Sequence, residues 1–281
     1  MIVLKNENYE AGLDTKGACL VFFNRRIENQ HSPPILRPSP IPIDDPIDAA
    51  CFPCVPFFGR ISDPLFFNDK SWPLSPNHPA VAPDCPIHGD GWLKVWDIEE
   101  QSHSRVVMSL SCPGNISHKL PYPWRATQTV SLNDNQLHTR LSLENFHHST
   151  ALMGLGLHPF FQRTPSTRLL MRCRDIYTPP FMPDLEESKL GFNKGGKLPL
   201  FPVDHSFQRW EGKATITDET GLEITIVSDA PFVHLYMPEN ENYFCLEPVS
   251  HLPGAFENDA IRDDLLLKTG TTKTLSMTIT V

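Results

Sequence analysis

Four ionisable residues lie in segments whose other residues are mostly apolar or turn-forming. Arg60 follows two phenylalanines and a glycine, and His88 precedes Gly-Asp-Gly-Trp. His158 lies within the uncharged sequence Gly-Leu-Gly-Leu-His-Pro-Phe-Phe, and Glu247 ends a strand-like run. Burying a charged group is costly unless it is paired, so such residues need an explanation. Imidazole and carboxylate groups are also those that most often move protons in enzymes.

Each of these residues has a structural interpretation beside the chemical one. Arg60 alone is more often an ion-pair partner, His158 a hydrogen-bonded core residue and Glu247 a solvated strand end. His88 is the stronger candidate, because its glycine neighbours allow close backbone approach and Trp92 offers a flat face for stacking. None of the four decides the function by itself.

The elements that position these residues are predicted to be β-strands. Apolar residues alternate with Thr and Ser in 272–281, which indicates a half-buried strand. Other segments that read as strands are 105–111, 126–132, 136–145, 222–228 and 233–237. Many short strands without interleaved helices are typical of an antiparallel sandwich or barrel.

The rest of the chain adds little regular structure to this prediction. Proline is densest between Ser32 and Pro86, where long elements are not expected. Short helical pieces are predicted only around 184–190 and 258–265. Because no repeat, low-complexity tract or linker divides the sequence, residues 1–281 are predicted to form a single domain.

Composition excludes several classes of function. The formal net charge of −9, without a cluster of Lys and Arg, argues against a nucleic-acid partner. No apolar run is long enough for a membrane helix, and the seven scattered cysteines are typical of reduced thiols in the cytoplasm. Cys51 and Cys54 form a lone C-x-x-C without further ligands, so no metal site is expected there. The absence of G-x-G-x-x-G, P-loop and G-x-S-x-G motifs makes a cofactor unexpected.

Taken in order, the chemical segments resemble one known family, the aldose 1-epimerases or galactose mutarotases. The matching residues are Gly59-Arg60-Ile61, His88-Gly89, Trp96, His158-Pro159-Phe160-Phe161, Asp204-His205-Ser206-Phe207 and Glu247-Pro248. The ordered set is specific, although each motif is weak alone, and the resemblance runs from about residue 13 to the C-terminus.

The resemblance implies a large antiparallel β-sandwich with a sugar pocket on a concave sheet face. It also implies roles in exchanging the anomers of a free monosaccharide. Glu247 is the general base at the C1 hydroxyl and His158 the general acid at the ring oxygen. His88, Arg60 and Asp204 hydrogen-bond the sugar, and Trp92 or Trp96 stacks on it. This chemistry requires neither a metal nor a redox cofactor.

Two departures from the family pattern leave the sugar open. Gly59 replaces the usual Asn before Arg60, and Asp90 stands where many members carry an aromatic residue. Both positions are expected near the pocket. One alternative is a mutarotase of a phosphorylated or sulfonated hexose, whose extra cations could be Lys94, Arg125, Arg163 or Arg209. Another is a non-catalytic carbohydrate-binding protein on the same fold. The sequence leaves monomer and homodimer equally open.

Overall fold

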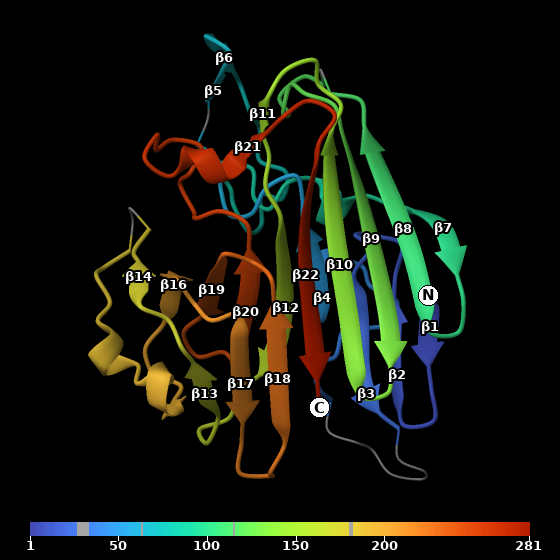
Figure 1. Cartoon of the computed structure of the whole chain (residues 1–281), viewed down its shortest axis with the longest axis vertical. Helices are drawn as coiled ribbons and strands as arrows, with labels where there is room; N and C mark the ends of the chain where they lie inside the picture. The colour runs from blue at the N-terminus through green and yellow to red at the C-terminus, as the bar shows by residue number, and fades with distance from the viewer. Residues whose placement is uncertain (27–33, 63, 115, 180–181) are drawn as a thin grey trace.

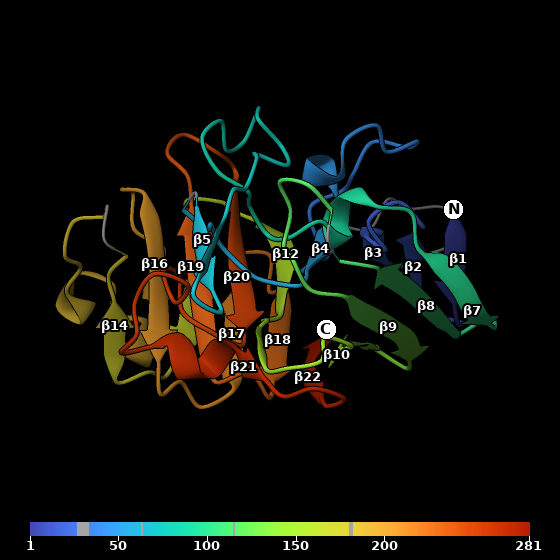
Figure 2. The same cartoon turned by 90° about the horizontal axis from the view of Figure 1, so that it is seen from above.

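The computed structural model describes residues 1–26, 34–62, 64–114, 116–179 and 182–281. The described chain is almost entirely β-structure, and two large antiparallel sheets lie face to face (Figures 1 and 2). This arrangement confirms the predicted antiparallel β-sandwich.

The first sheet has nine strands in the described residues, and it will be called the site sheet. In spatial order its strands are β1 (Ile2–Lys5), β2 (Tyr9–Leu13), β3 (Leu20–Arg25), β4 (Cys51–Cys54), β12 (Gly156–Gln162), β20 (Tyr243–Val249), β19 (Phe232–Met237), β16 (Val203–Gln208) and β14 (Asp175–Tyr177). Strands β4, β12 and β20 are therefore central, with antiparallel neighbours on both sides.

The second sheet also has nine strands in the described residues and carries most of the strands that were predicted. In spatial order they are β15 (Gly196–Lys197), β13 (Arg168–Met171), β17 (Lys213–Thr217), β18 (Glu223–Ser228), β22 (Thr272–Thr280), β10 (Gln136–Asn145), β9 (Trp124–Asn133), β8 (Arg105–Cys112) and β7 (Asp97–Gln101). Five of the six predicted strands correspond to β8, β9, β10, β18 and β22, and the sixth is β19 of the site sheet.

The remaining elements are short. Two small pairings join β5 (Leu65–Phe67) to β6 (Lys70–Trp72), and β11 (Ala151–Leu152) to β21 (Leu266–Leu267). The described helical elements are single 3₁₀ turns, η1 (Pro46–Asp48), η2 (Gly91–Leu93), η3 (Glu187–Lys189), η4 (Phe192–Lys194) and η5 (Arg262–Leu265).

The short elements agree with the predictions made for these regions. Elements η3 and η5 lie in the two predicted helical pieces. The proline-rich stretch holds only short elements, and its residues 32, 33 and 63 lie outside the described residues. Among the described helices, none has the length and hydrophobicity needed to cross a bilayer.

Two apolar clusters hold the fold together. The larger fills the space between the sheets, where the alternation along β10 places Leu137, Leu141 and Leu143 inside. The smaller cluster includes Phe52, Phe160 and Trp92 and joins central strands of the site sheet to the loops that cross their outer side. Figure 2 shows these loops, in blue and teal, gathered above the site sheet. The central strands are consequently buried on both faces.

Because β10 has one face in the core between the sheets, substitutions at adjacent positions of this strand should have very different effects on the free energy of unfolding. Leu141 is fully buried and lies opposite Leu275 of β22, whereas Arg140 is exposed. We expect Leu141→Ala to lower the free energy of unfolding by about 2–5 kcal/mol, because it leaves a cavity. Arg140→Ala, as the matched control, should change it by no more than about 0.5 kcal/mol. Equal effects in urea titrations would contradict the assigned register.

Candidate active site

A cavity of about 690 Å³ lies on the outer side of the site sheet. Its lining includes five of the six residues proposed from sequence, namely Arg60, His88, His158, Asp204 and Glu247. Three of them come from strands β12, β16 and β20, and the other two come from loops. Residues separated by up to 187 positions in the sequence therefore converge on one site.

His158 and Glu247 form the centre of this site. The register that pairs Gly156 with Val249 and Phe160 with Cys245 also places His158 opposite Glu247 on the adjacent strand. The imidazole Nε2 is 3.4 Å from a carboxylate oxygen of Glu247, and both side chains are almost fully buried. Because both strands are central in the sheet, the two groups are held by backbone hydrogen bonds on both sides.

Aromatic rings fix the His158 imidazole in place. Phe52 stacks on one side with ring centroids 4.5 Å apart, and Phe160 also stacks on it at 4.6 Å. Within the described part of the chain, neither His158 Nδ1 nor Glu247 Oε2 has a hydrogen-bond partner, although both atoms are buried. Leaving buried polar atoms unpaired is costly, so they are candidates for contact with a ligand.

Burial shifts the pKa values of this pair in opposite directions. It raises the pKa of Glu247 well above its ordinary value, and the negative charge of Asp204 raises it further. Burial lowers the pKa of His158 to about 3, with a further contribution from His234. Low-polarity surroundings disfavour the charged form of each group.

A tight turn presents His88 to the same cavity. His88 and Gly89 both adopt positive φ angles, of 55° and 69°. The Gly59 N–H donates to His88 Nδ1 at 3.2 Å, which leaves the proton on Nε2. Burial, followed by the charges of His158 and Arg60, lowers the pKa of His88 well below its ordinary value. His88 is therefore a neutral hydrogen-bond donor.

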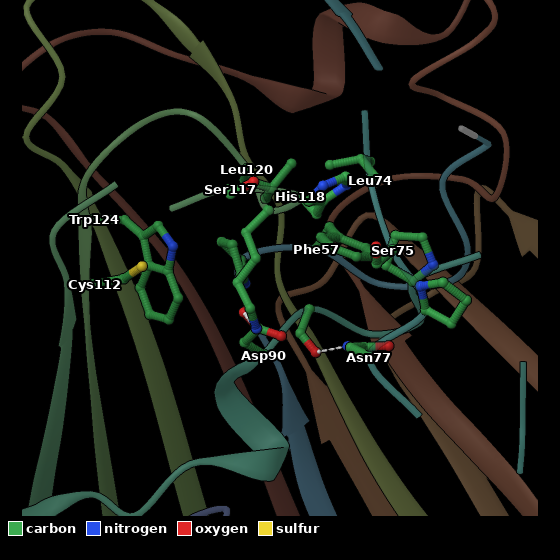
Figure 3. Close-up of a pocket in the computed structure, with 15 residues that line it drawn as sticks. Phe57, Leu74, Ser75, Asn77, Asp90, Cys112, Ser117, His118, Leu120 and Trp124 are labelled. Atoms are coloured by element: carbon green, nitrogen blue, oxygen red, sulfur yellow. Dashed lines mark hydrogen bonds and ion pairs between the residues drawn. The ribbon is translucent and has the colours of Figure 1, made fainter. Parts of the chain in front are cut away.

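Asn77 holds the His88 turn from behind. Its side-chain amide donates to the carbonyl oxygens of Ile87 and Gly89, at 2.8 and 2.6 Å, and accepts from the Ile87 N–H at 2.8 Å. Figure 3 shows Asn77 and its bond to the turn. These bonds stabilise the positive-φ backbone that aims His88 at the cavity.

A second cavity, of about 130 Å³, adjoins this turn and contains Asp90 (Figure 3). The Asp90 carboxylate forms an ion pair with Lys119 at 2.5 Å. Asp90 is not among the residues that line the larger cavity, whereas Gly59 is. Of the two substituted positions, Gly59 therefore lines the larger cavity itself, whereas Asp90 lies two residues beyond His88 with its carboxylate engaged by Lys119.

Asp204 is positioned by a residue that the sequence analysis missed. His234 Nε2 lies 2.9 Å from an Asp204 carboxylate oxygen, and its Nδ1 is 2.8 Å from the Ser206 hydroxyl. Burial alone would raise the pKa of Asp204, but the hydrogen bond and charge of His234, together with Arg60, outweigh it and lower the pKa. The signal for His234 was present in the sequence, as a lone histidine in the strand predicted over 233–237.

Arg37 is a second residue that the sequence analysis missed. It comes from the proline-rich stretch and lines the cavity beside Asp48. Its guanidinium lies 3.7 Å from the Phe160 ring centroid and 4.8 Å from that of Tyr243. It also donates to the carbonyl oxygens of Ile47 and Ala49. These contacts anchor the loop above the site sheet.

The structure contradicts a stacking role for Trp92. Its side chain is fully buried and does not line the larger cavity, because Phe52 and His78 stack on it at 4.9 and 5.1 Å. Trp96 is likewise buried, with its indole N–H donating to the Gly91 carbonyl. A ring without an accessible face does not stack on a ligand: Trp92 packs in the smaller apolar cluster on the outer side of the site sheet, and Trp96 packs in the larger cluster.

None of the four cations considered for a charged sugar lines the larger cavity. They are Lys94, Arg125, Arg163 and Arg209. Arg125 pairs with Glu99 and Arg209 with Asp175.

The sequence also matches a known protein family. A profile of the aldose 1-epimerase family matches residues 1–280. The chain belongs to the aldose 1-epimerase family. A curated relative, the Escherichia coli K12 protein YphB, is 29% identical over 253 residues, covering 83% of this chain and 84% of YphB. YphB is itself described as uncharacterised.

Two solved structures share the fold over nearly their whole length. A candidate aldose 1-epimerase from Escherichia coli K12 is 25% identical, with a TM-score of 0.85 over 99% of this chain and 97% of that one. A galactose mutarotase-like protein from Lactobacillus casei is 18% identical, with a TM-score of 0.79 over 100% and 99% of the two chains. At that identity the second likeness shows the fold alone.

The contact between His234 and Asp204 generates a prediction that does not depend on activity. His234→Ala removes the hydrogen bond that favours the carboxylate, so the pKa of Asp204 should rise. Carboxyl ¹³C NMR titration of Asp204 measures this shift. Ser206→Ala is the matched control, because it leaves the bond from His234 Nε2 to Asp204 in place. An unchanged Asp204 pKa in His234→Ala would show that the contact does not hold the carboxylate.

Proposed function

We propose that this protein is a mutarotase that interconverts the α and β anomers of a free, uncharged monosaccharide. The observation that carries the proposal is the buried pair of His158 and Glu247, which face each other 3.4 Å apart in the cavity. At about 690 Å³ the cavity falls within the range of about 300–1,000 Å³ that is common for small-molecule sites. Membership of the aldose 1-epimerase family supports the same reaction class.

The reaction needs one proton accepted and one proton donated. Glu247 takes the proton of the C1 hydroxyl while His158 gives a proton to the ring oxygen, and the C1–O5 bond breaks to give the open-chain aldehyde. Rotation about C1–C2 then exposes the other carbonyl face, and the two groups exchange roles as the ring closes. Burial disfavours the charged forms that begin this step, an ionised Glu247 and a protonated His158, but once they form it makes the carboxylate a stronger base and the imidazolium a stronger acid.

The other lining residues bind the sugar in this proposal. His88 donates its Nε2 proton to a ring or hydroxyl oxygen, and Arg60 stabilises negative charge that develops during ring opening. The carboxylate of Asp204, kept ionised by His234, accepts hydrogen bonds from hydroxyls further round the ring. Burial of a sugar against these groups also supplies partners for the unpaired polar atoms of the catalytic pair.

The charges around the cavity favour an uncharged substrate over a phosphorylated or sulfonated one. Four carboxyl groups line it, from Asp48, Asp204, Glu247 and Glu257. Two arginines, Arg37 and Arg60, oppose them, and Arg37 already donates to two backbone carbonyls. An anionic group would enter a cavity in which carboxyl groups outnumber cations, which opposes binding.

A carbohydrate-binding protein without activity is the less favoured function. Burying His158 beside Glu247 with unpaired atoms costs stability, and such a cost is typical of catalytic sites. The cytoplasmic location, the single-domain organisation and the choice between monomer and homodimer stay predictions from the sequence.

Polarimetry of freshly dissolved α-D-glucose and α-D-galactose tests the proposal. We expect wild type to accelerate the change in optical rotation beyond the buffer rate. Glu247→Gln and His158→Asn should each lose about 10²- to 10⁴-fold in rate, because each removes one proton-transfer group. If either variant exchanged anomers at the wild-type rate, the role assigned to the substituted residue would be wrong.

The control variant is Arg209→Ala, which breaks an exposed ion pair with Asp175 away from the cavity. It should keep the wild-type rate. Hexose 6-phosphates in the same assay test the charge argument, because wild type should act on them less efficiently than on neutral hexoses. The reverse preference would overturn the assignment of an uncharged sugar.

A further inference from the structure

A third metal-binding side chain lies beside the catalytic pair. The donor atoms of His158, Cys245 and Glu247 all lie within 4.8 Å of one another, and all three residues are buried. Cys245 and Glu247 are two residues apart on β20, so their side chains project from the same face of the strand. His158 reaches the same place from the neighbouring strand β12.

These donors match the preferences of Zn²⁺. Zinc in proteins takes thiolate, imidazole and carboxylate ligands at about 2.0–2.3 Å, so its ligand atoms lie roughly 3–4 Å apart. The separation of 3.4 Å between His158 Nε2 and Glu247 Oε1 is already in that range. Three protein ligands leave a fourth position for water, and His158 and Glu247 line the open cavity from which the ion and the water would enter.

Charge and hydrogen bonding favour an ion at this place. A thiolate and a carboxylate together neutralise one divalent cation, which suits a buried site. Glu247 Oε2 is buried without a hydrogen-bond partner in the described chain and offers a lone pair to a ligand. The carboxylate of Asp204, which also lines the cavity, attracts cations towards the site. Soft thiolate and imidazole ligands select zinc over magnesium or calcium.

The C-x-x-C motif is not part of this ligand set. Cys51 and Cys54 lie three positions apart on one strand, so their side chains project from opposite faces. Cys51 packs in the core between the sheets, and Cys54 packs in the cluster on the outer side. Side-chain alternation along β20 places Cys245 beside Glu247, and the pairing of β20 with β12 brings both to His158.

We propose that His158, Cys245 and Glu247 form a zinc-binding site at which Zn²⁺ blocks the catalytic pair. The ion displaces the thiol proton of Cys245 and any proton bound to His158 or Glu247, and the displaced protons go to solvent. No electron transfer is involved. With its base and its acid coordinated, the protein has no group left to move a proton to or from the sugar. The inhibitory part of this proposal rests on the proposed mutarotase function, whereas the binding site does not.

Metal binding is measured on the metal-free protein, first by calorimetric titration with Zn²⁺ and then with Co²⁺ as a spectroscopic probe. Wild type should bind zinc, and its cobalt form should show a thiolate-to-metal charge-transfer absorption. Cys245→Ser should weaken zinc binding by at least about tenfold and abolish that absorption. His158→Asn, a second variant that keeps the thiol, should also weaken zinc binding while retaining the absorption.

Cys51→Ser is the matched control, because this buried thiol points into the opposite core. It should bind zinc as wild type does. Zinc affinity that is unchanged in Cys245→Ser, or lost equally in Cys51→Ser, would overturn the site.

Inhibition is measured separately, on anomer exchange. Zinc should inhibit wild type reversibly, with recovery after chelation, and magnesium should have no effect. Cys245→Ser should stay active and require at least about tenfold more zinc for inhibition. Full activity of zinc-saturated wild type would contradict a block of the catalytic pair. A wild type that binds zinc through Cys245 but never exchanges anomers would refute the mutarotase function and leave the metal site standing.

Discussion

The structure depends on keeping one carboxyl group and one imidazole group buried face to face. Glu247 and His158 occupy central strands of a nine-stranded sheet, where both faces of the strands are covered. Desolvating such groups costs free energy, which the surrounding apolar and aromatic contacts must offset. The same desolvation produces the opposed pKa shifts of the pair. The feature that costs stability is therefore the one that provides the chemistry.

The two sheets and the loops contribute differently to the site. The sheet pairing fixes the acid and the base through strand register, so their separation does not rely on loop conformation. The loops bring Arg60, His88 and Arg37 to the cavity. In the loops, individual side-chain contacts take the place of the backbone hydrogen bonds that join the strands. The His88 ring accepts a hydrogen bond from the Gly59 N–H, and the Asn77 amide holds the backbone on either side of His88. Arg37 is held by stacking on Phe160. Rigid strands thus carry the proton-transfer groups, and clamped loops shape the cavity around them.

Sequence reasoning predicted five of the nine described strands of the second sheet, and the clearest of them face the core on one side and water on the other. Apolar and polar residues alternate along β10 and β22 because buried and more exposed positions alternate there. Strands β4, β12 and β20 are buried on both faces, so they read as mostly apolar stretches without a period, and Glu247 is the one charged residue among them. His158 and Glu247 could be proposed from family motifs, but their contact follows from a pairing across 89 residues that no local pattern encodes. Local patterns were likewise silent on the partnership of His234 with Asp204, and the Trp92 stacking prediction was wrong because exposure of a ring is decided by tertiary packing.

The measurement that tests the account most directly is a double-mutant cycle on the rate of anomer exchange. If Glu247 and His158 act as one proton-transferring unit, the variant carrying both Glu247→Gln and His158→Asn should be about as slow as the worse single variant. Losses that multiply in the double variant would mean that the two residues act independently, which would contradict a shared acid–base pair.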